Sequence, residues 1–166
     1  MISKKGKNFT LATVEDAQEI LKLYRSVIGS EGCTWSLEYP NEENISADLS
    51  RASLFCMKTE EGEIIGAISI DDDPEVEQLT CWTKELSPGG ELARLVVKES
   101  YQNQSIARKL LQEGMQELKK RGYQSVHFLV SKTNYRAIHS YNKFQFETKG
   151  ESNLFGECWW CYEKEL

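Results

Sequence analysis

The sequence predicts a single α/β (α+β) domain built on a mixed sheet that is flanked by helices. The main observation is a strand-helix-strand unit, with an apolar run over 91–97, a polar turn, a helix-period segment over 106–122 and a second apolar run over 126–130. A helical crossover of this kind joins parallel strands and is right-handed. With 166 residues, 40% apolar and 28% charged, we expect one compact domain over 1–166.

The chain ahead of this unit predicts a strand, two helices and a hairpin. Thr13 and Asp16 have the spacing of a capping box, and Gly29 is a natural end for the helix that starts there. Glu60-Glu61-Gly62 is a tight turn in which glycine supplies the positive φ of a hairpin connection. The expected elements are a strand over 8–12, a helix over 13–29, a short helix over 42–51, and strands over 53–59 and 63–70.

The chain beyond the unit predicts a short helix and two more strands. The helix opens over 133–141, and the strands lie near 144–147 and over 157–163. The polar connection over 71–90 begins with Asp71-Asp72-Asp73, which lacks the spacing of a calcium loop and is interpreted as solvated.

The charge and hydropathy of the chain exclude several classes of partner. A net charge of −6 makes nucleic acid and anionic membranes poor partners, because both bind concentrated basic surfaces, and it fits a cationic substrate better. The chain has no run of about 18 apolar residues, and residues 1–7 lack the apolar stretch of a secretory signal. We therefore expect a soluble cytoplasmic protein.

The cysteines do not predict a disulfide framework or a metal site. There are five of them, scattered along the chain. Cys158-Trp159-Trp160-Cys161 has a redox or zinc spacing, but no second Cys or His pair stands nearby to complete a four-ligand site. If the segment is a strand, positions three apart point to opposite faces. We expect a structural role for these residues, and no metal.

Two polar segments are candidates for a functional site. The turn over 98–105 precedes a helix, so several of its backbone N–H groups are expected to be unpaired at the positive end of the helix dipole, where anions bind. The loop over 29–41 combines Trp35 and Tyr39 with acidic residues outside any periodicity. These aromatic side chains either wall a site or cover the core.

The order of elements and two motifs resemble the GNAT (Gcn5-related) N-acetyltransferase family. The turn motif of that family begins with Gln or Arg, continues with any two residues, Gly and any one residue, and ends with Gly or Ala. The corresponding residues here are Gln102-Asn103-Gln104-Ser105-Ile106-Ala107, with Ser105 in the place of the first glycine. Its later Asn, Ala, Tyr, Gly-Phe pattern is followed by Asn134, Ala137, Tyr141 and Phe146. Gln145 replaces the glycine of that pattern.

This resemblance implies a mostly antiparallel sheet with one parallel pair of strands that splay apart. It implies acetyl-CoA as co-substrate, with its pyrophosphate over the turn and its pantetheine arm along the exposed edge of the 91–97 strand. Ser105 is expected to keep the site, its hydroxyl capping the helix or bonding a phosphate oxygen; loss of cofactor binding is the alternative. The expected cofactor-binding residues are Leu95, Val97, Gln102, Asn103, Gln104, Ser105, Ile106, Ala107, Asn134 and Tyr141.

The resemblance also implies direct attack of an amine on the thioester, which needs a base for the ammonium proton and an acid for the departing thiolate. Tyr141 matches the family's general-acid position. Glu91 precedes Gln102 by the interval of the catalytic glutamate in histone-acetylating members, so it is the candidate base. His127 and His139 are its rivals because histidine titrates near neutral pH, but one lies in an apolar strand and the other diverges from Tyr141 on a helix.

We expect the acceptor to be the amine of a small molecule. Its pocket would be walled by Tyr24, Trp35, Tyr39 and Trp82. Acetylation of a protein N-terminus or lysine is one alternative, although the long aromatic loop favours a partly closed pocket over an open groove. A non-catalytic acyl-CoA sensor is another, motivated by Ser105. Dimers are common in the family, so a homodimer is also considered.

Overall fold

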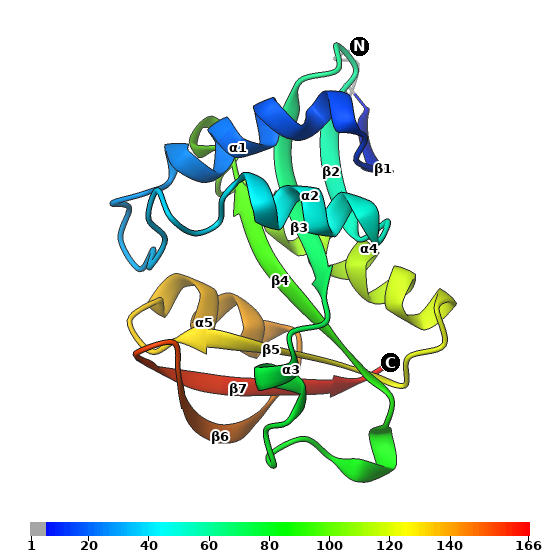
Figure 1. Cartoon of the computed structure of the whole chain (residues 1–166), viewed down its shortest axis with the longest axis vertical. Coiled ribbons are helices and arrows are strands. Elements are labelled where there is room, and N and C mark those ends of the chain that lie inside the picture. Colours follow the sequence, from blue (N-terminus) through cyan, green and yellow to red (C-terminus); the bar gives the residue numbers. More distant parts are fainter. Residues whose placement is uncertain (1–5) are drawn as a thin grey trace.

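The computed structural model describes residues 6–166, which form one seven-stranded sheet with helices on both faces (Figure 1). The strand order is β1-β2-β3-β4-β5-β7-β6. Every neighbouring pair is antiparallel except β4 and β5, which are parallel, so the predicted mixed sheet is confirmed. The strands are β1 Lys7–Leu11, β2 Leu54–Thr59, β3 Ile64–Asp71, β4 Gly89–Val97, β5 Ser125–Ser131, β6 Glu147–Leu154 and β7 Glu157–Glu165.

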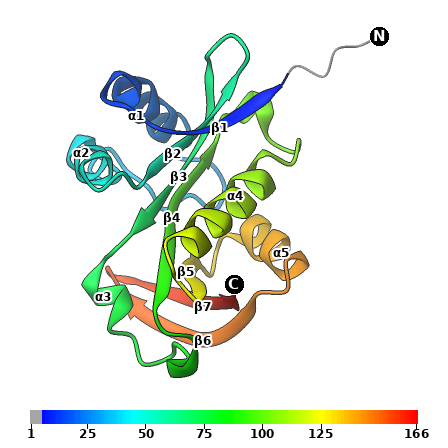
Figure 2. The same cartoon turned by 90° about the vertical axis from the view of Figure 1, so that its right-hand side faces the viewer.

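The helices divide between the two faces of the sheet. Figure 2 shows α1 and α2 on one side and α4 and α5 on the other. None of the helices within residues 6–166 is both long and apolar enough to cross a membrane. The helices are α1 Ala17–Ser26, α2 Glu42–Ser50, α3 Pro74–Glu77, α4 Ile106–Lys120 and α5 Tyr135–Lys143, with short 3-10 turns at Val14–Asp16, Lys84–Leu86 and Glu99–Tyr101.

Local patterns predicted most elements to within a few residues. The capping box is present, because the Thr13 N–H donates to Asp16 Oδ2 at 2.9 Å, but it opens a 3-10 turn that leads into α1. The helix ends at Ser26 instead of Gly29, since residues 27–29 form a turn. The connection over 71–90 is not wholly irregular: it holds α3 and a 3-10 turn that the sequence did not predict.

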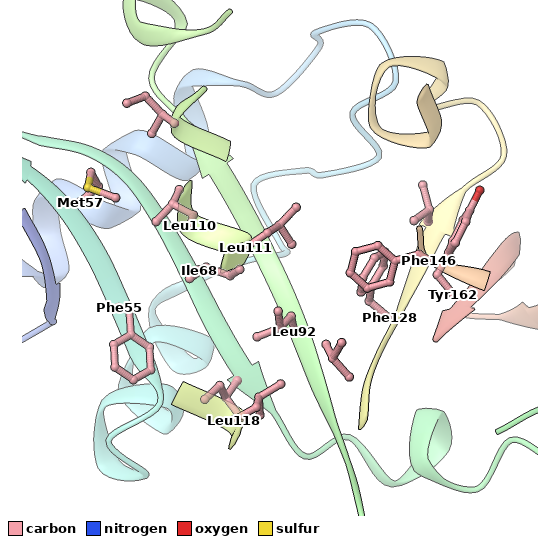
Figure 3. Close-up of a cluster of buried hydrophobic side chains, with 14 of the residues drawn as sticks. Phe55, Met57, Ile68, Leu92, Leu110, Leu111, Leu118, Phe128, Phe146 and Tyr162 are labelled. Carbon is pink, nitrogen blue, oxygen red and sulfur yellow. The ribbon is translucent and has the colours of Figure 1, made fainter. Parts of the chain in front are cut away.

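The larger hydrophobic core lies between the sheet and α4, whose side chains fall on one helical face as the periodicity indicated. Figure 3 shows Leu110 and Leu111 of α4 beside Ile68 and Leu92 of the sheet, with an aromatic group around Phe128 of β5. The approach is close, since a Cβ added at Gly66 would lie 2.8 Å from Leu110 Cδ1. This packing holds the first half of α4 against β3 and β4.

β4 and β5 pair only at their beginnings. Gly89, Gly90 and Glu91 are in register with residues 125–127, and β4 then continues to Val97 without a partner on that edge. Figure 1 shows the two strands diverging from a common start. The strand edge beyond Glu91 is therefore open, as expected for a splayed parallel pair.

Candidate functional site

A β-bulge at Arg94 sits at the start of the open edge of β4. Arg94 adopts a left-handed backbone conformation with φ +51°, and the register with β3 shifts between Ala67 and Ser69 opposite it. A bulge places one extra residue in a strand, bends it and increases its twist. The bend contributes to the divergence of β4 from β5.

The buried carboxylate of Asp48 and the partly buried one of Asp71 hold the Arg94 side chain. Its Nε and Nη2 donate to Asp48 of α2 at 3.1 and 2.8 Å, and its Nη1 donates to Asp71 Oδ2 at 2.9 Å and to the Tyr39 hydroxyl at 3.2 Å. Asp48 also accepts from Ser69 at 2.7 Å and from Arg51 at 2.6 Å. All nitrogens of the guanidinium are thereby engaged, so Arg94 is a structural cation of the bulge.

The turn before α4 presents a row of unpaired backbone donors. Within residues 6–166, the N–H groups of 103–108 have no backbone acceptor, whereas the Gln102 N–H donates to Glu99 O at 3.1 Å. Ser105 has φ +64°, the left-handed region that favours glycine, and its side chain makes no capping hydrogen bond. The hydroxyl therefore does not cap the helix. The turn keeps the shape that glycine would give it, and its free N–H groups at the beginning of a helix have the geometry that suits an anion.

Side chains brace this turn from two directions. Gln102 Nε2 donates to Val97 O at 3.2 Å, which ties the turn to the end of β4. Arg136, at the beginning of α5, donates to Asn103 Oδ1 at 2.9 Å and to Gln102 Oε1 at 3.5 Å. The side chain of Gln102 thus holds the turn, while its N–H is already bonded to Glu99 O, and Arg136 adds a positive charge beside the turn.

One cleft of about 1090 Å³ connects the turn, the open strand edge and the loop after α1. Ligand pockets usually measure ~300–1,000 Å³, so this cleft has room for two molecules that meet inside it. Of the predicted cofactor-binding residues, Gln104 lies outside it and instead lines a shallow hollow with Lys109. The predicted residues that line the cleft are Leu95, Val97, Gln102, Asn103, Ser105, Ile106, Ala107, Asn134 and Tyr141.

Asn134 and Tyr141 reach the cleft from α5. Asn134 is the N-cap of α5, and its Oδ1 accepts from the Ala137 N–H at 3.2 Å. The Tyr141 ring packs against Phe128 with centroids 4.6 Å apart and against Phe146 and Tyr162. Burial, with a smaller effect of Tyr162, raises the pKa of Tyr141 to about 12. The phenol is therefore fully protonated at neutral pH.

Glu91 lies where β4 and β5 begin to part. Its side chain is 6% exposed, lines the cleft, and its Oε1 has no hydrogen-bond partner within the described part of the chain. Burial first, and then the negative charges of Asp71, Asp73 and Glu77, raise the pKa of Glu91 well above its usual value, although Arg94 opposes them. A carboxylate with a raised pKa holds a proton more strongly than an ordinary one.

Neither histidine lines the cleft. His127 is 2% exposed, stacks on Trp82 with ring centroids 4.5 Å apart, and bonds Glu77 Oε1 through Nε2 at 2.8 Å. His139 is exposed on α5. His127 is in register with Glu91 in the sheet, but its side chain is engaged by Trp82 and Glu77 and does not line the cleft.

The aromatic wall differs from the one predicted. Trp35 and Tyr39 line the cleft, but Tyr24 and Trp82 do not. Tyr24 is 1% exposed and packs edge-on against Trp35 from behind, because the helical period of α1 turns it into the core. Trp82 instead donates from Nε1 to Val76 O at 2.8 Å and covers His127. Phe155 and Trp159, from the turn between β6 and β7 and the start of β7, complete the wall.

Comparison with known families agrees with this geometry. A family model described as the acetyltransferase (GNAT) family matches residues 14–146. The chain belongs to the GNAT acetyltransferase family. Its match covers the turn, the open strand and α5, all of which line the cleft. Among curated proteins, no sequence match is found.

Solved structures share the GNAT fold at low sequence identity. A GNAT family acetyltransferase from Listeria monocytogenes is 18% identical with TM-score 0.77, covering 100% of this chain and 98% of that chain. The protein yncA from Salmonella typhimurium, solved with its cofactor acetyl-CoA, is 16% identical with TM-score 0.74, over 97% and 94%. The ribosomal-protein-S18-alanine N-acetyltransferase from Escherichia coli is 16% identical with TM-score 0.72, over 96% and 94%.

Several residues of this GNAT cleft escaped prediction from the sequence. Arg94 and its partner Asp48 lie 46 positions apart and meet only through the packing of α2 on the sheet. Arg136 carried a weak signal, because it stands in the first turn of a helix that begins at a motif asparagine. Phe155 and Gly156 indicate a hairpin turn with an exposed aromatic side chain, but no neighbouring residue in the sequence indicates that this turn lies at the cleft.

Proposed function

We propose that this GNAT protein is an N-acetyltransferase that transfers the acetyl group of acetyl-CoA to the primary amine of a small molecule. The observation that carries the proposal is one continuous cleft, with unpaired N–H groups at the α4 turn and both Glu91 and Tyr141 along it. Residues with these properties supply anion binding, a proton acceptor and a hydrogen-bond donor.

The turn and the open strand fit the chemistry of acetyl-CoA. The N–H groups over 103–108 and the Arg136 guanidinium would hold the pyrophosphate at the beginning of α4. The free edge of β4 at Leu95 and Val97 would pair with the amide groups of the pantetheine arm in the manner of an added strand. The fold likeness to a protein solved with acetyl-CoA supports this assignment.

Glu91 would act as the base. It lies at the apex between β4 and β5, and in its ionised form its raised pKa makes it a stronger proton acceptor for an approaching ammonium group. The freed amine then attacks the thioester carbonyl, so that an N–C bond forms as the C–S bond breaks. The first proton stays on the Glu91 carboxylate. The second proton, which the nitrogen loses as it becomes an amide, passes to the departing thiolate, so that CoA leaves as the free thiol.

Tyr141 would stabilise the departing sulfur. With a pKa of about 12 against about 8.5 for a simple thiol, complete proton transfer from the phenol to the thiolate is uphill by about 5 kcal/mol. Tyr141 therefore serves better as a hydrogen-bond donor to the developing negative charge than as the final proton source.

The loop after α1 favours a small acceptor. Trp35 and Tyr39 close the cleft on that side, and Gly32 lies so close to Asn134 that an added Cβ would be 3.0 Å from its Cα. A peptide amine is a second candidate, favoured by exposed aromatic side chains on the cleft, with Tyr39 45% and Phe155 57% exposed. The fold likeness to a ribosomal-protein-S18-alanine N-acetyltransferase supports the same candidate.

Calorimetry and thiol release would test the proposal together. We expect acetyl-CoA to bind, and free CoA to appear when small primary amines are added but not with peptides of matched N-termini. Turnover with peptides alone would replace the small-molecule acceptor by a protein. Binding without turnover on any amine would identify an acyl-CoA sensor. Absence of binding would refute the proposal.

A further inference from the structure

Charge is distributed unequally around the cleft. The cationic side chains that line it away from the bulge, Arg108, Arg136 and Lys143, belong to α4 and α5. The carboxylate side chains that line it come from the loop after α1, the end of β3 and the segment after it, β4, and the beginning of β7: Glu31, Asp71, Asp73, Glu91 and Glu157. Figure 2 shows α4 and α5 on the side of the sheet opposite α1 and α2. An anionic cofactor fits the first set, and a cationic acceptor fits the second.

The one cationic side chain that lines the acidic side of the cleft within residues 6–166 is already fully hydrogen-bonded. That side chain is Arg94, and Asp48, Asp71 and Tyr39 engage all of its guanidinium nitrogens. Within residues 6–166, the carboxylates of Glu31 and Glu157 take part in no hydrogen bond or ion pair. An acceptor that carries a carboxylate would meet repulsion here.

Glu91 supplies an independent indication of a ligand. It is 6% exposed, lines the same cleft, and its Oε1 is unpartnered within the described residues. Buried polar atoms almost always have a partner, because an unsatisfied one costs free energy. An ammonium group in the cleft would provide that donor.

Aromatic side chains line the same cleft as Glu91 and the exposed carboxylates. Trp35, Tyr39, Phe155 and Trp159 line the acidic side of the cleft, and all are at least partly exposed. Such surfaces pack well against methylene groups and attract cations to their faces. They suit an apolar chain with a positive charge at each end.

We propose that the acceptor is a small aliphatic diamine or polyamine, with its reacting amine at Glu91 and its second ammonium group at Glu31 and Glu157. This inference rests on the proposed N-acetyltransferase function and specifies its substrate class. The second ammonium group does not react. It selects the substrate and holds the chain along the aromatic wall.

Three four-carbon amines that differ only in their second end would test the inference by initial rates of CoA release. They are 1,4-diaminobutane, n-butylamine and 4-aminobutanoate. We expect kcat/KM to be about three- to tenfold higher for the diamine than for butylamine, and lowest for 4-aminobutanoate, because each exposed ion pair contributes up to about 1 kcal/mol. The preference should fall as salt concentration rises.

A double variant, Glu31→Gln with Glu157→Gln, should bring the ratio of diamine to butylamine close to one. Glu165→Gln is the matched control, since Glu165 is exposed on β7 and does not line the cleft, and it should keep the wild-type ratio. Equal use of butylamine or 4-aminobutanoate, an unchanged ratio in the double variant, or turnover of peptides alone would overturn the inference.

The failure of the underlying function would look different. If acetyl-CoA neither binds in calorimetry nor supports release of CoA with any of the three amines, the N-acetyltransferase proposal fails and the diamine inference falls with it. If acetyl-CoA binds and butylamine is acetylated without a preference for the diamine, only the diamine inference fails.

Discussion

Replacing Asp48 by Asn tests the claim that a buried ion pair holds the bulge of β4. Asp48 is 1% exposed and accepts hydrogen bonds from both Arg94 and Ser69. The Asp48→Asn change keeps the shape of the side chain but removes its charge. Arg94 then stays buried with only Asp71 as an ionic partner.

Loss of one partner from a buried pair costs about 3–5 kcal/mol, since a buried charge is left uncompensated. The remaining contact with Asp71 places the expected loss near the lower end, at about 3 kcal/mol. For a domain of this size that corresponds to a drop in Tm of about 6–12 °C. Because the bulge shapes the open edge of β4, we also expect weaker binding of acetyl-CoA.

Urea unfolding and calorimetry would measure both effects. Asp72→Asn is the matched control: Asp72 is 74% exposed in its side chain and lies 3.6 Å from Arg51, so its loss should cost less than about 1 kcal/mol. If Asp48→Asn cost no more than the control, with an unchanged slope of the urea transition, the ion pair would not hold the bulge and this reasoning would be refuted.

Three further variants probe the cleft. Glu91→Gln should lower kcat/KM by about 10²-fold or more and flatten the rise of kcat/KM with pH. Because the pKa of Glu91 is raised in the folded state, ionisation of Glu91 destabilises the wild-type protein as pH rises through that pKa. Glu91→Gln should therefore have a higher Tm than the wild type above that pKa and the same Tm in acid. Tyr141→Phe should lower kcat by about 10²-fold while the calorimetric Kd for acetyl-CoA stays unchanged. Ser105→Gly should relieve the left-handed backbone, stabilise the protein by about 1 kcal/mol and tighten acetyl-CoA binding.

Each of these variants has an outcome that contradicts its premise. A pH profile of Glu91→Gln that matches the wild type would remove Glu91 from proton transfer. Full turnover by Tyr141→Phe would do the same for the phenol. For Ser105, Gln104→Gly is the control, because that position has no positive φ. If both glycine variants were destabilised alike, backbone strain at Ser105 would not be the cause.

The sequence predicted the parts of the fold that depend on local pattern. The period of α4, the capping box at Thr13 and the strand-helix-strand unit follow from residues within one or two turns of each other, and the structure confirms them. The position of the turn before α4 follows for the same reason, and so does the series of unpaired N–H groups in it.

The rest depends on contacts between residues that are distant in the chain. The residues Ala93 and Arg94 give no local sign of a bulge in β4, because the bulge is held by Asp48, which lies in α2. The alternation of 91–97 therefore could not tell on which face each side chain lies. The prediction that Trp82 lines the cleft depended only on its being a large aromatic residue in a loop. In the structure its Nε1 donates to the carbonyl of Val76 in α3, a helix that the sequence did not predict.

The bulge links the two proposals made for the cleft. Arg94 donates its hydrogen bonds to Asp48 and Asp71 and none to Glu91. Within residues 6–166, the Oε1 atom of the buried Glu91 side chain therefore has no hydrogen-bond donor. A cationic acceptor supplies the missing donor, and its charge lowers the pKa of Glu91, which favours the ionised form that the base needs. The features that raise the pKa of Glu91 in the free protein therefore also favour an acceptor that arrives with its proton and its positive charge.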